Sequence, residues 1–146
     1  FYLDQDHGPG LARDFGIKKA TADIIVLADS DDRCDPERLK ITYDFFIKNP
    51  SVSIVYGRSN RLDEKTGQIS PRPTCDFNPE LLKYYNFISN ITTAFKKEAY
   101  LKNRGYNPKI QTSEDYDLWL TFLEKGFKFG FMNKPLVLQK IHPGST

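Results

Sequence analysis

Residues 24–32 read Ile-Ile-Val-Leu-Ala-Asp-Ser-Asp-Asp, so an unbroken apolar run leads directly into three aspartates. A continuous, mostly branched run of this kind is typical of a strand covered on both faces, as in a parallel or mixed sheet. In open α/β sheets, ligands bind beyond the carboxyl ends of the strands. The stretch therefore predicts both a buried strand and a ligand site at its end.

Helical and strand-like patterns alternate on both sides of this stretch. Asp35 and Pro36 form a helix start, with an acidic N-cap and proline at the first helical position. Patterning predicts helices over 11–20, 35–48, 81–87, 97–103 and 113–125, strands over 52–56, 88–95, 127–132 and 136–141, and a polar hairpin over 58–69. The alternation indicates one α/β domain over residues 1–146, with a mixed, mostly parallel sheet and helices on both faces.

Composition excludes several classes of protein. The chain has 146 residues, of which 39% are apolar and 27% charged, as in a soluble globular domain. Its longest apolar run has five residues, whereas a membrane-spanning helix needs about 20. The net charge is +2 without a basic block, which argues against nucleic acid as a partner. Cys34 and Cys75 match neither a metal spacing nor a disulfide framework.

The acidic cluster Asp29, Asp31 and Asp32 needs a physical reason. Two carboxylates about 4 Å apart repel by roughly 4 kcal/mol at an effective dielectric of 20. A divalent cation such as Mg²⁺ or Mn²⁺ offsets this repulsion, because these ions prefer oxygen ligands. The alternative is that the aspartates only form a turn. A calcium-binding EF-hand loop is excluded, because Arg33, Cys34 and Lys40 stand at three of its required positions.

A second acidic pair, Glu114-Asp115, opens the helix that carries the apolar stripe around Trp119. Thr112 and Asp115 fit a capping box, and acids in a first turn favour the helix dipole. The functional alternative is that one carboxylate faces a cleft as a general base. The two interpretations are compatible, because a helix N-terminus holds a carboxylate rigidly and keeps it ionised. Trp119 itself is expected in the core.

The order of these motifs resembles glycosyltransferase family 2, whose members have the GT-A nucleotide-sugar fold. The resemblance covers nearly the whole chain and rests on residues 8–17, the apolar strand with its Asp-Ser-Asp, Pro36-Glu37-Arg38-Leu39, Val55-Tyr56-Gly57, residues 114–120 and Ile141-His142-Pro143-Gly144-Ser145. It implies an inverting, metal-dependent transfer of a sugar from a nucleotide-diphosphate sugar to an acceptor hydroxyl.

The resemblance also implies roles for individual residues. Asp29, Asp31 and Asp32, with Arg13, would contact the donor; Asp31 and Asp29, with His142, would hold Mn²⁺ or Mg²⁺; Asp115 would be the catalytic base; and Glu114 would line the acceptor side. The implied acceptor is a carbohydrate or a lipid-linked saccharide. The implied location is cytoplasmic, with any attachment at the membrane periphery made by regions outside this sequence.

Two departures from the family pattern bear on these expectations. Asp14 and Asp6 stand where relatives usually carry asparagine, which adds negative charge near the expected donor pocket. The chain also starts at Phe1 and has Met132 as its single methionine, so we expect an amino-terminally truncated GT-A domain without the first strand-helix units. A nucleotidyltransferase of similar fold and a non-catalytic nucleotide-sugar-binding module remain as alternatives.

Overall fold

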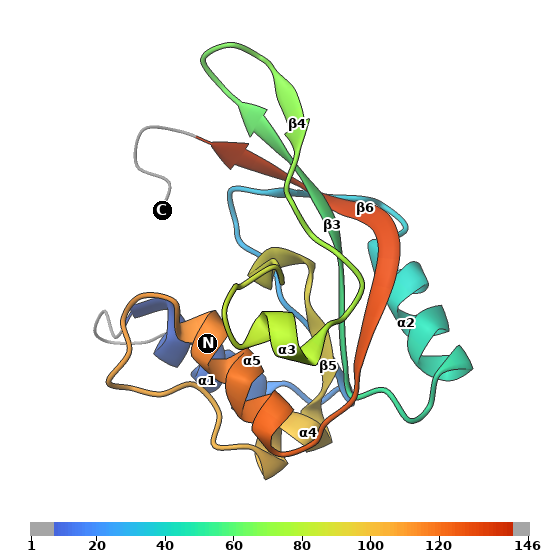
Figure 1. The fold of residues 1–146 in the computed structure, drawn as a ribbon, viewed down its shortest axis with the longest axis vertical. Helices are drawn as coiled ribbons and strands as arrows, with labels where there is room; N and C mark the ends of the chain where they lie inside the picture. The colour runs from blue at the N-terminus through green and yellow to red at the C-terminus, as the bar shows by residue number, and fades with distance from the viewer. Residues whose placement is uncertain (1–7, 142–146) are drawn as a thin grey trace.

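The computed structural model describes residues 8–141 and places a mixed sheet between helices (Figure 1). The helices are α1 (Gly8–Lys19), α2 (Arg38–Lys48), α3 (Pro79–Leu82), α4 (Lys97–Lys102) and α5 (Glu114–Glu124), with a 3-10 turn η1 (Asn90–Thr92). The strands are β1 (Ile24–Val26), β2 (Arg33–Cys34), β3 (Ile54–Asp63), β4 (Ile69–Pro71), β5 (Ala94–Lys96) and β6 (Phe129–Ile141). Every helix in this range is too short or too polar to cross a lipid bilayer.

The strands follow the order β1-β5-β3-β6-β2, and β4 pairs with β3. Figure 1 shows β3 and β6 side by side along most of the molecule; their pairing is parallel. The other four pairings are antiparallel. The expected mixed α/β fold is therefore confirmed, whereas the expectation of a mostly parallel sheet is wrong. As the apolar run predicted, β1 is covered on both faces. Burial on both faces is compatible with either strand direction, and β1 pairs antiparallel with β5.

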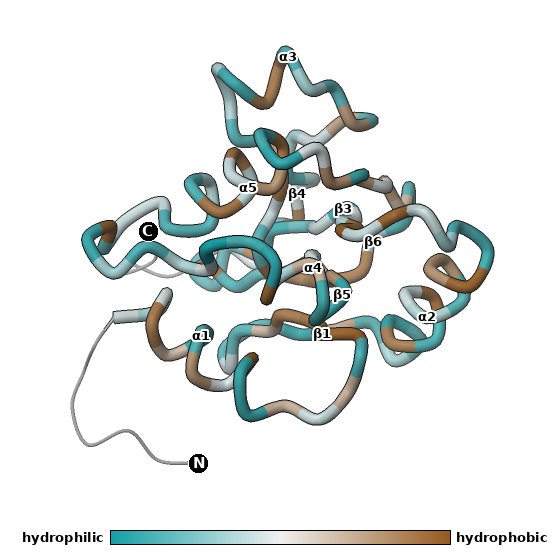
Figure 2. The backbone as a smooth tube through the Cα atoms, turned by 90° about the horizontal axis from the view of Figure 1, so that it is seen from below, coloured by the Kyte–Doolittle hydropathy of each residue, from teal (hydrophilic) through white to brown (hydrophobic). Residues whose placement is uncertain are grey.

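Two apolar clusters cover the two faces of the sheet, as the sequence predicts. Ile54 and Tyr56 of β3 face one cluster, which also holds residues of α1 and α5. Val55, between them, faces the other cluster together with Phe46 of α2. Figure 2 shows α1 and α2 on opposite sides of β1. Trp119 has no exposed surface, which confirms its expected place in the core.

Several element bounds differ from the sequence expectation. The two expected final strands form one strand, β6, whose register with β3 shifts between Gly57 and Ser59. Pro135 lies at this irregularity, where a residue without an N–H is tolerated. The expected helix over 81–87 is the short α3, where the Asn78 side chain accepts a hydrogen bond from the Leu81 N–H at 2.9 Å. The expected strand over 88–95 contains η1 followed by β5.

Candidate functional site

A cavity of about 630 Å³ brings together four of the residues singled out from the sequence: Arg13, Asp29, Glu114 and Asp115. They come from α1, from the loop after β1 and from the first turn of α5. The remaining wall is mostly polar and consists of Pro9, Arg72, Asn86, Ser89, Asn90, Ile91, Gln111, Thr112, Ser113 and Gln139. The carboxylates expected on the donor side and on the acceptor side thus share one cavity.

Arg13 joins the two acidic groups. Its Nη2 lies 2.9 Å from Oδ1 of Asp29, and its Nη1 lies 2.7 Å from Oε1 of Glu114. The Glu114 side chain is 11% exposed, so this carboxylate depends on the guanidinium for compensation. Asp29 and Glu114 are far apart in the sequence, and Arg13 fixes their relative position.

The close approach of α1 to α5 depends on Gly10. A Cβ atom at this position would lie 3.0 Å from Cγ of Glu114 and 3.4 Å from the Tyr106 ring. Any larger side chain would press on the carboxylate that Arg13 holds. Figure 1 shows the two helices on the same side of the sheet.

Asp115 lies at the start of α5, largely shielded from solvent. Burial raises the pKa of its carboxyl, and the neighbouring Glu114 adds to this effect. The Tyr116 N–H, which donates to Oδ1 at 2.7 Å, acts in the opposite direction on the pKa, as do Asn86 and Arg72. The carboxylate is thus a stronger proton acceptor than an exposed aspartate, as a general base requires.

The expected capping box at this helix does not form. Ser113, in the left-handed conformation with φ 60°, occupies the N-cap position and makes no side-chain capping bond. The Asp115 carboxylate accepts a hydrogen bond from the N–H of Tyr116, the next residue of the helix, rather than from Thr112. Asp115 therefore lines the cavity without a capping role toward Thr112.

The three aspartates after β1 have different surroundings. Asp29 lines the cavity, whereas Asp31 is exposed and Asp32 accepts a hydrogen bond from the Lys140 N–H of β6 at 3.1 Å. Burial raises the pKa of Asp32, and the charges of Asp31 and Asp29 contribute. Neither Asp31 nor Asp32 lines the cavity wall. Asp32 thus attaches the loop to the sheet, a contact the sequence did not suggest.

Arg38 stabilises the loop that carries the three aspartates. This buried side chain donates from Nη2 to the Leu27 carbonyl at 2.6 Å and from Nη1 to Sγ of Cys34 at 3.0 Å. It therefore connects the beginning and the end of the loop. Asp35 was expected to be the N-cap of the next helix, which is wrong, because α2 begins at Arg38 with Glu37 at its N-cap position. The Asp35 carboxylate instead accepts a hydrogen bond from the Glu37 N–H at 2.8 Å, in the turn before the helix.

Metal binding remains a prediction. Within residues 8–141, no three histidine, cysteine or acidic side chains gather closely enough to form a metal site. Mg²⁺ is often held by one or two carboxylates together with waters and substrate phosphates, so Asp29 and Asp31 stay predicted ligands. His142, the third predicted ligand, lies outside the described residues, as does Asp6.

Asp14 does not add charge to the cavity. Its carboxylate accepts a hydrogen bond from the Tyr100 hydroxyl at 2.7 Å and pairs with Lys18 at 2.7 Å. Burial, reinforced by Asp14, raises the pKa of Tyr100, so the phenol stays protonated and donates. Asp14, which stands where relatives usually carry asparagine, therefore connects α1 to Tyr100 of α4.

Sequence reasoning missed two residues near the site. Arg72 lies in the proline-containing loop after β4 and lines the cavity. Tyr106 is 4% exposed, and its hydroxyl has no hydrogen-bond partner among the described groups. Burial raises the Tyr106 pKa, and the charges of Arg13, Asp115 and Glu114 act on it. Neither residue belongs to a local motif, so only the three-dimensional arrangement reveals them.

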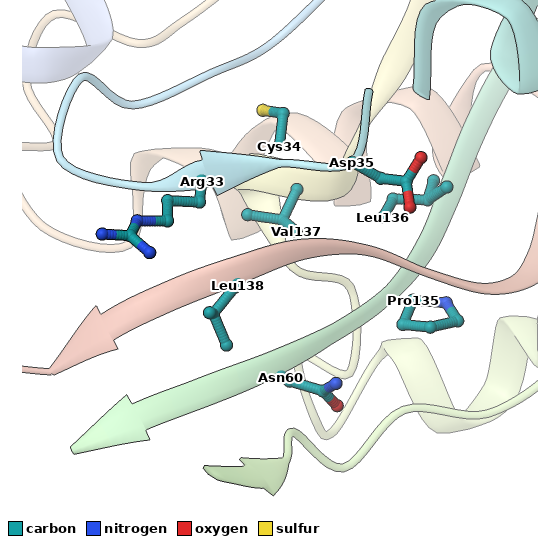
Figure 3. A pocket seen from close by; sticks show the side chains of 8 residues that line it. All are labelled: Arg33, Cys34, Asp35, Asn60, Pro135, Leu136, Val137 and Leu138. Carbon is teal, nitrogen blue, oxygen red and sulfur yellow. The ribbon is translucent and has the colours of Figure 1, made fainter. Parts of the chain in front are cut away.

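A smaller cavity of about 290 Å³ lies at the other strand edge, where β2 meets β6 (Figure 3). Side chains of β2, β3 and β6 surround it, and none of the predicted site residues contributes. Its wall lacks a group of facing carboxylates. We therefore assign the candidate site to the larger cavity because of its chemistry.

Comparisons with known proteins confirm the family resemblance. The family model of Glycosyl transferase family 2 matches residues 1–112. The O-antigen biosynthesis glycosyltransferase WbnJ of Escherichia coli is 31% identical over 92% of this chain and 54% of its own length. An Escherichia coli UDP-Gal:alpha-D-GlcNAc-diphosphoundecaprenol beta-1,3-galactosyltransferase is 30% identical over 86% of this chain and 46% of its own length.

Solved structures confirm the fold. S. aureus TarS superimposes with a TM-score of 0.74 over 97% of this chain and 26% of its own, at 16% identity. The chain spans about half the length of the two curated relatives described above. Because the family model matches most of its residues, the chain belongs to glycosyl transferase family 2.

Proposed function

We propose that the cavity transfers a sugar from a nucleotide-diphosphate sugar to an acceptor hydroxyl. The observation that carries the proposal is that Asp29 and Asp115 line the same cavity although 85 residues of sequence lie between them. Family membership supports the reaction class. The UDP-galactose donor named for one relative and a TarS complex with UDP-GlcNAc support a UDP-sugar as the donor.

Asp115 acts as the general base in this proposal. It removes the proton of the acceptor hydroxyl while the hydroxyl oxygen forms a bond to the anomeric carbon. The bond from that carbon to the diphosphate oxygen breaks at the same time, and the nucleoside diphosphate leaves. Attack opposite to the leaving group inverts the configuration. The raised pKa of Asp115 favours proton acceptance.

Donor binding involves Asp29 and Arg13, with Asp31 and Asp32 nearby in the loop. The Oδ1 atom of Asp29 is already oriented by Arg13, which preorganises this wall. A divalent cation held by Asp29 and Asp31, with His142 as a further ligand, would neutralise charge that develops on the leaving diphosphate. Glu114, held by the same arginine, would line the acceptor side.

The cavity wall also suits a ligand rich in hydroxyl groups. The oxygens Oδ1 of Asn90 and Oε1 of Gln139 are buried there without hydrogen-bond partners among the described residues. A buried acceptor without a donor costs about 1–3 kcal/mol. Water or sugar hydroxyls that donate to these oxygens would remove this cost. A lipid-linked acceptor, as named for one relative, is part of the proposal, and the cytoplasmic location stays a prediction.

The test is to identify the products of the intact protein. Incubation with UDP-sugars and Mn²⁺, followed by mass spectrometry, should yield a nucleoside diphosphate and a glycoside. Release of pyrophosphate would instead indicate a nucleotidyltransferase. Binding of a UDP-sugar without turnover would indicate a non-catalytic module, and either result would refute the proposal.

A further inference from the structure

Helix α2 carries an exposed apolar row that the proposed reaction does not use. Leu39, Tyr43 and Ile47 are 67%, 57% and 61% exposed. Because they are spaced four residues apart, they lie one above the other along the helix. Phe46, which is buried against the sheet, lies on a different face of α2. Contiguous apolar groups on a surface mark an interaction site.

A groove opens beside the second half of this row. Its volume is about 460 Å³, and its apolar wall consists of Ile24, Tyr43, Phe46, Ile47 and Pro50. Tyr43, Phe46 and Ile47 belong to the C-terminal half of α2, whereas Leu39, the most exposed member of the row, lies near its N-terminus. The helix therefore has a protruding side chain at one end and an apolar groove at the other.

The charges on one flank of the row alternate in sign along α2. They are Glu37, Lys40, Asp44 and Lys48, at spacings of three or four residues. Lys40 pairs with Asp44 within the helix at 2.8 Å, whereas Glu37 and Lys48 are exposed and form no ion pair within residues 8–141. A second α2 that runs in the opposite direction would place Glu37 beside Lys48 and Lys40 beside Asp44. A parallel second helix would place like charges together.

We propose that α2 is the contact surface of a two-fold symmetric dimer of this chain. In this antiparallel pair, Tyr43 faces its own copy at the two-fold axis. Leu39 enters the groove beside Ile47 of the second copy, and the second copy does the same in return. Such an interface is isologous, because the same patch serves both subunits.

The balance of charges favours a second copy of this chain over a membrane surface. Helices that lie on anionic lipid are rich in lysine and arginine on their polar face. The flank of α2 holds two acidic and two basic residues instead. Opposite charges in equal number suit a partner that carries the same alternating pattern.

The proposed dimer leaves the candidate site of each subunit accessible. Figure 1 shows α2 on one side of β3 and β6, and α1 and α5 on the other. Arg13, Glu114 and Asp115 of the candidate site belong to α1 and α5. Dimer formation is therefore independent of the proposed sugar transfer, and turnover per subunit should not depend on it.

Light scattering of the intact protein over a concentration series tests the dimer. A contact made by one helix face is small compared with a standard interface of about 1,600 Å², so we expect a dissociation constant in the micromolar range. Tyr43→Glu should weaken the dimer at least about 100-fold, because two carboxylates would meet at the axis. Tyr84→Glu is the matched control, since this tyrosine is 86% exposed outside α2 and should not matter.

A charge exchange tests the predicted pairing across the interface. Glu37→Lys and Lys48→Glu should each weaken the dimer about five- to tenfold, because each places two like charges together at both ends of the interface. The double variant restores opposite charges and should dimerise as the wild type does. A double variant as weak as either single variant would overturn the antiparallel arrangement.

Cysteine cross-linking tests the direction of the two helices. In a Cys34→Ser/Cys75→Ser background, Tyr43→Cys should form a disulfide-linked dimer under mild oxidation. Leu39→Cys should link to Ile47→Cys in a mixture of the two variants but not to itself, because eight residues of helix separate the two copies of position 39 by about 12 Å. Efficient linkage of Leu39→Cys to itself would indicate a parallel pair and contradict the proposal.

A wild type that stays monomeric up to millimolar concentration would overturn the proposal. Maleimide labelling of Tyr43→Cys would then show what covers the row: protection would indicate another segment of the same chain, and rapid labelling a free face. Binding of the monomer to vesicles of phosphatidylcholine and phosphatidylglycerol would indicate a membrane surface. If Tyr43→Glu unfolds at a lower temperature than the wild type, the charge exchange decides instead.

Discussion

Asp115 combines two properties that oppose each other: its burial disfavours the charged form, whereas a general base must be charged to act. Burial raises the pKa of the carboxyl, while the Tyr116 N–H and Arg72 favour the carboxylate. In the unfolded chain, aspartate ionises near pH 4. Between this value and the higher native pKa, the native state holds the extra proton, so the free energy of unfolding decreases as the pH rises. Ionised Asp115 therefore costs stability at neutral pH.

The variant Asp115→Asn should separate function from stability. We expect kcat to fall by about 10²–10⁴-fold, because the base is lost. We expect the free energy of unfolding at neutral pH to increase by on the order of 1 kcal/mol, because no charge is buried. Denaturant unfolding from pH 3 to 8 should show the gain appearing above about pH 4.

Asp117→Asn is the matched control for this variant. Asp117 lies on the same helix but pairs with Arg104 and does not line the cavity. It should keep wild-type turnover. A similar loss of turnover in both variants would show that the changes act through α5 as a whole.

Arg13 should contribute to stability through the two carboxylates that it neutralises. We expect Arg13→Gln to lower the free energy of unfolding by about 1–3 kcal/mol, because Glu114 is then buried without a cation. The double variant Arg13→Gln/Glu114→Gln should recover at least half of this loss in urea denaturation. If the stability changes of the two single variants simply add up in the double variant, the Arg13–Glu114 ion pair does not contribute to stability.

The packing of α1 against α5 depends on one of the three glycines within α1. Gly10→Ala places a methyl group 3.0 Å from Glu114 Cγ, and we expect it to lower stability by about 1–3 kcal/mol and to reduce activity. Gly16→Ala adds a methyl group that meets nothing within 4 Å and should raise stability by about 0.5–1 kcal/mol. Thermal unfolding of both variants tests this difference. Equal shifts of the unfolding temperature in the two variants would mean that Gly10 does not pack tightly against Glu114.

The elements that the sequence predicted well carry strong local patterns. The apolar stripe around Trp119 and the terminal Gly126, whose φ is 74°, define α5 closely. The hairpin of β3 and β4 follows from Gly67 at its turn. Strand direction could not be predicted, because burial on both faces of β1 is the same for either direction. The capping box was wrong because the left-handed Ser113 changes the geometry that capping requires.

The site as a whole was partly predictable. Asp29, Glu114 and Asp115 lie in motifs, and the cavity that they share with Arg13 agrees with the expected grouping. Asp31 and Asp32 are outside the cavity wall, because Asp32 binds β6 and Asp31 faces solvent. Arg72 has no motif: its position depends on a contact with Ser59 in another strand. Contacts of this kind between distant segments leave no periodic signal in a sequence.

One paired measurement tests the claim that Asp29 and Asp115 serve donor binding and catalysis in a common cavity. Calorimetric titration with UDP and turnover of a UDP-sugar should be measured on the same preparations of the intact wild type, Asp29→Asn and Asp115→Asn. We predict that Asp115→Asn binds UDP as the wild type does but turns over at least about 100-fold more slowly, and that Asp29→Asn binds UDP more weakly. Wild-type turnover in Asp115→Asn, or wild-type UDP affinity in Asp29→Asn, would contradict this account.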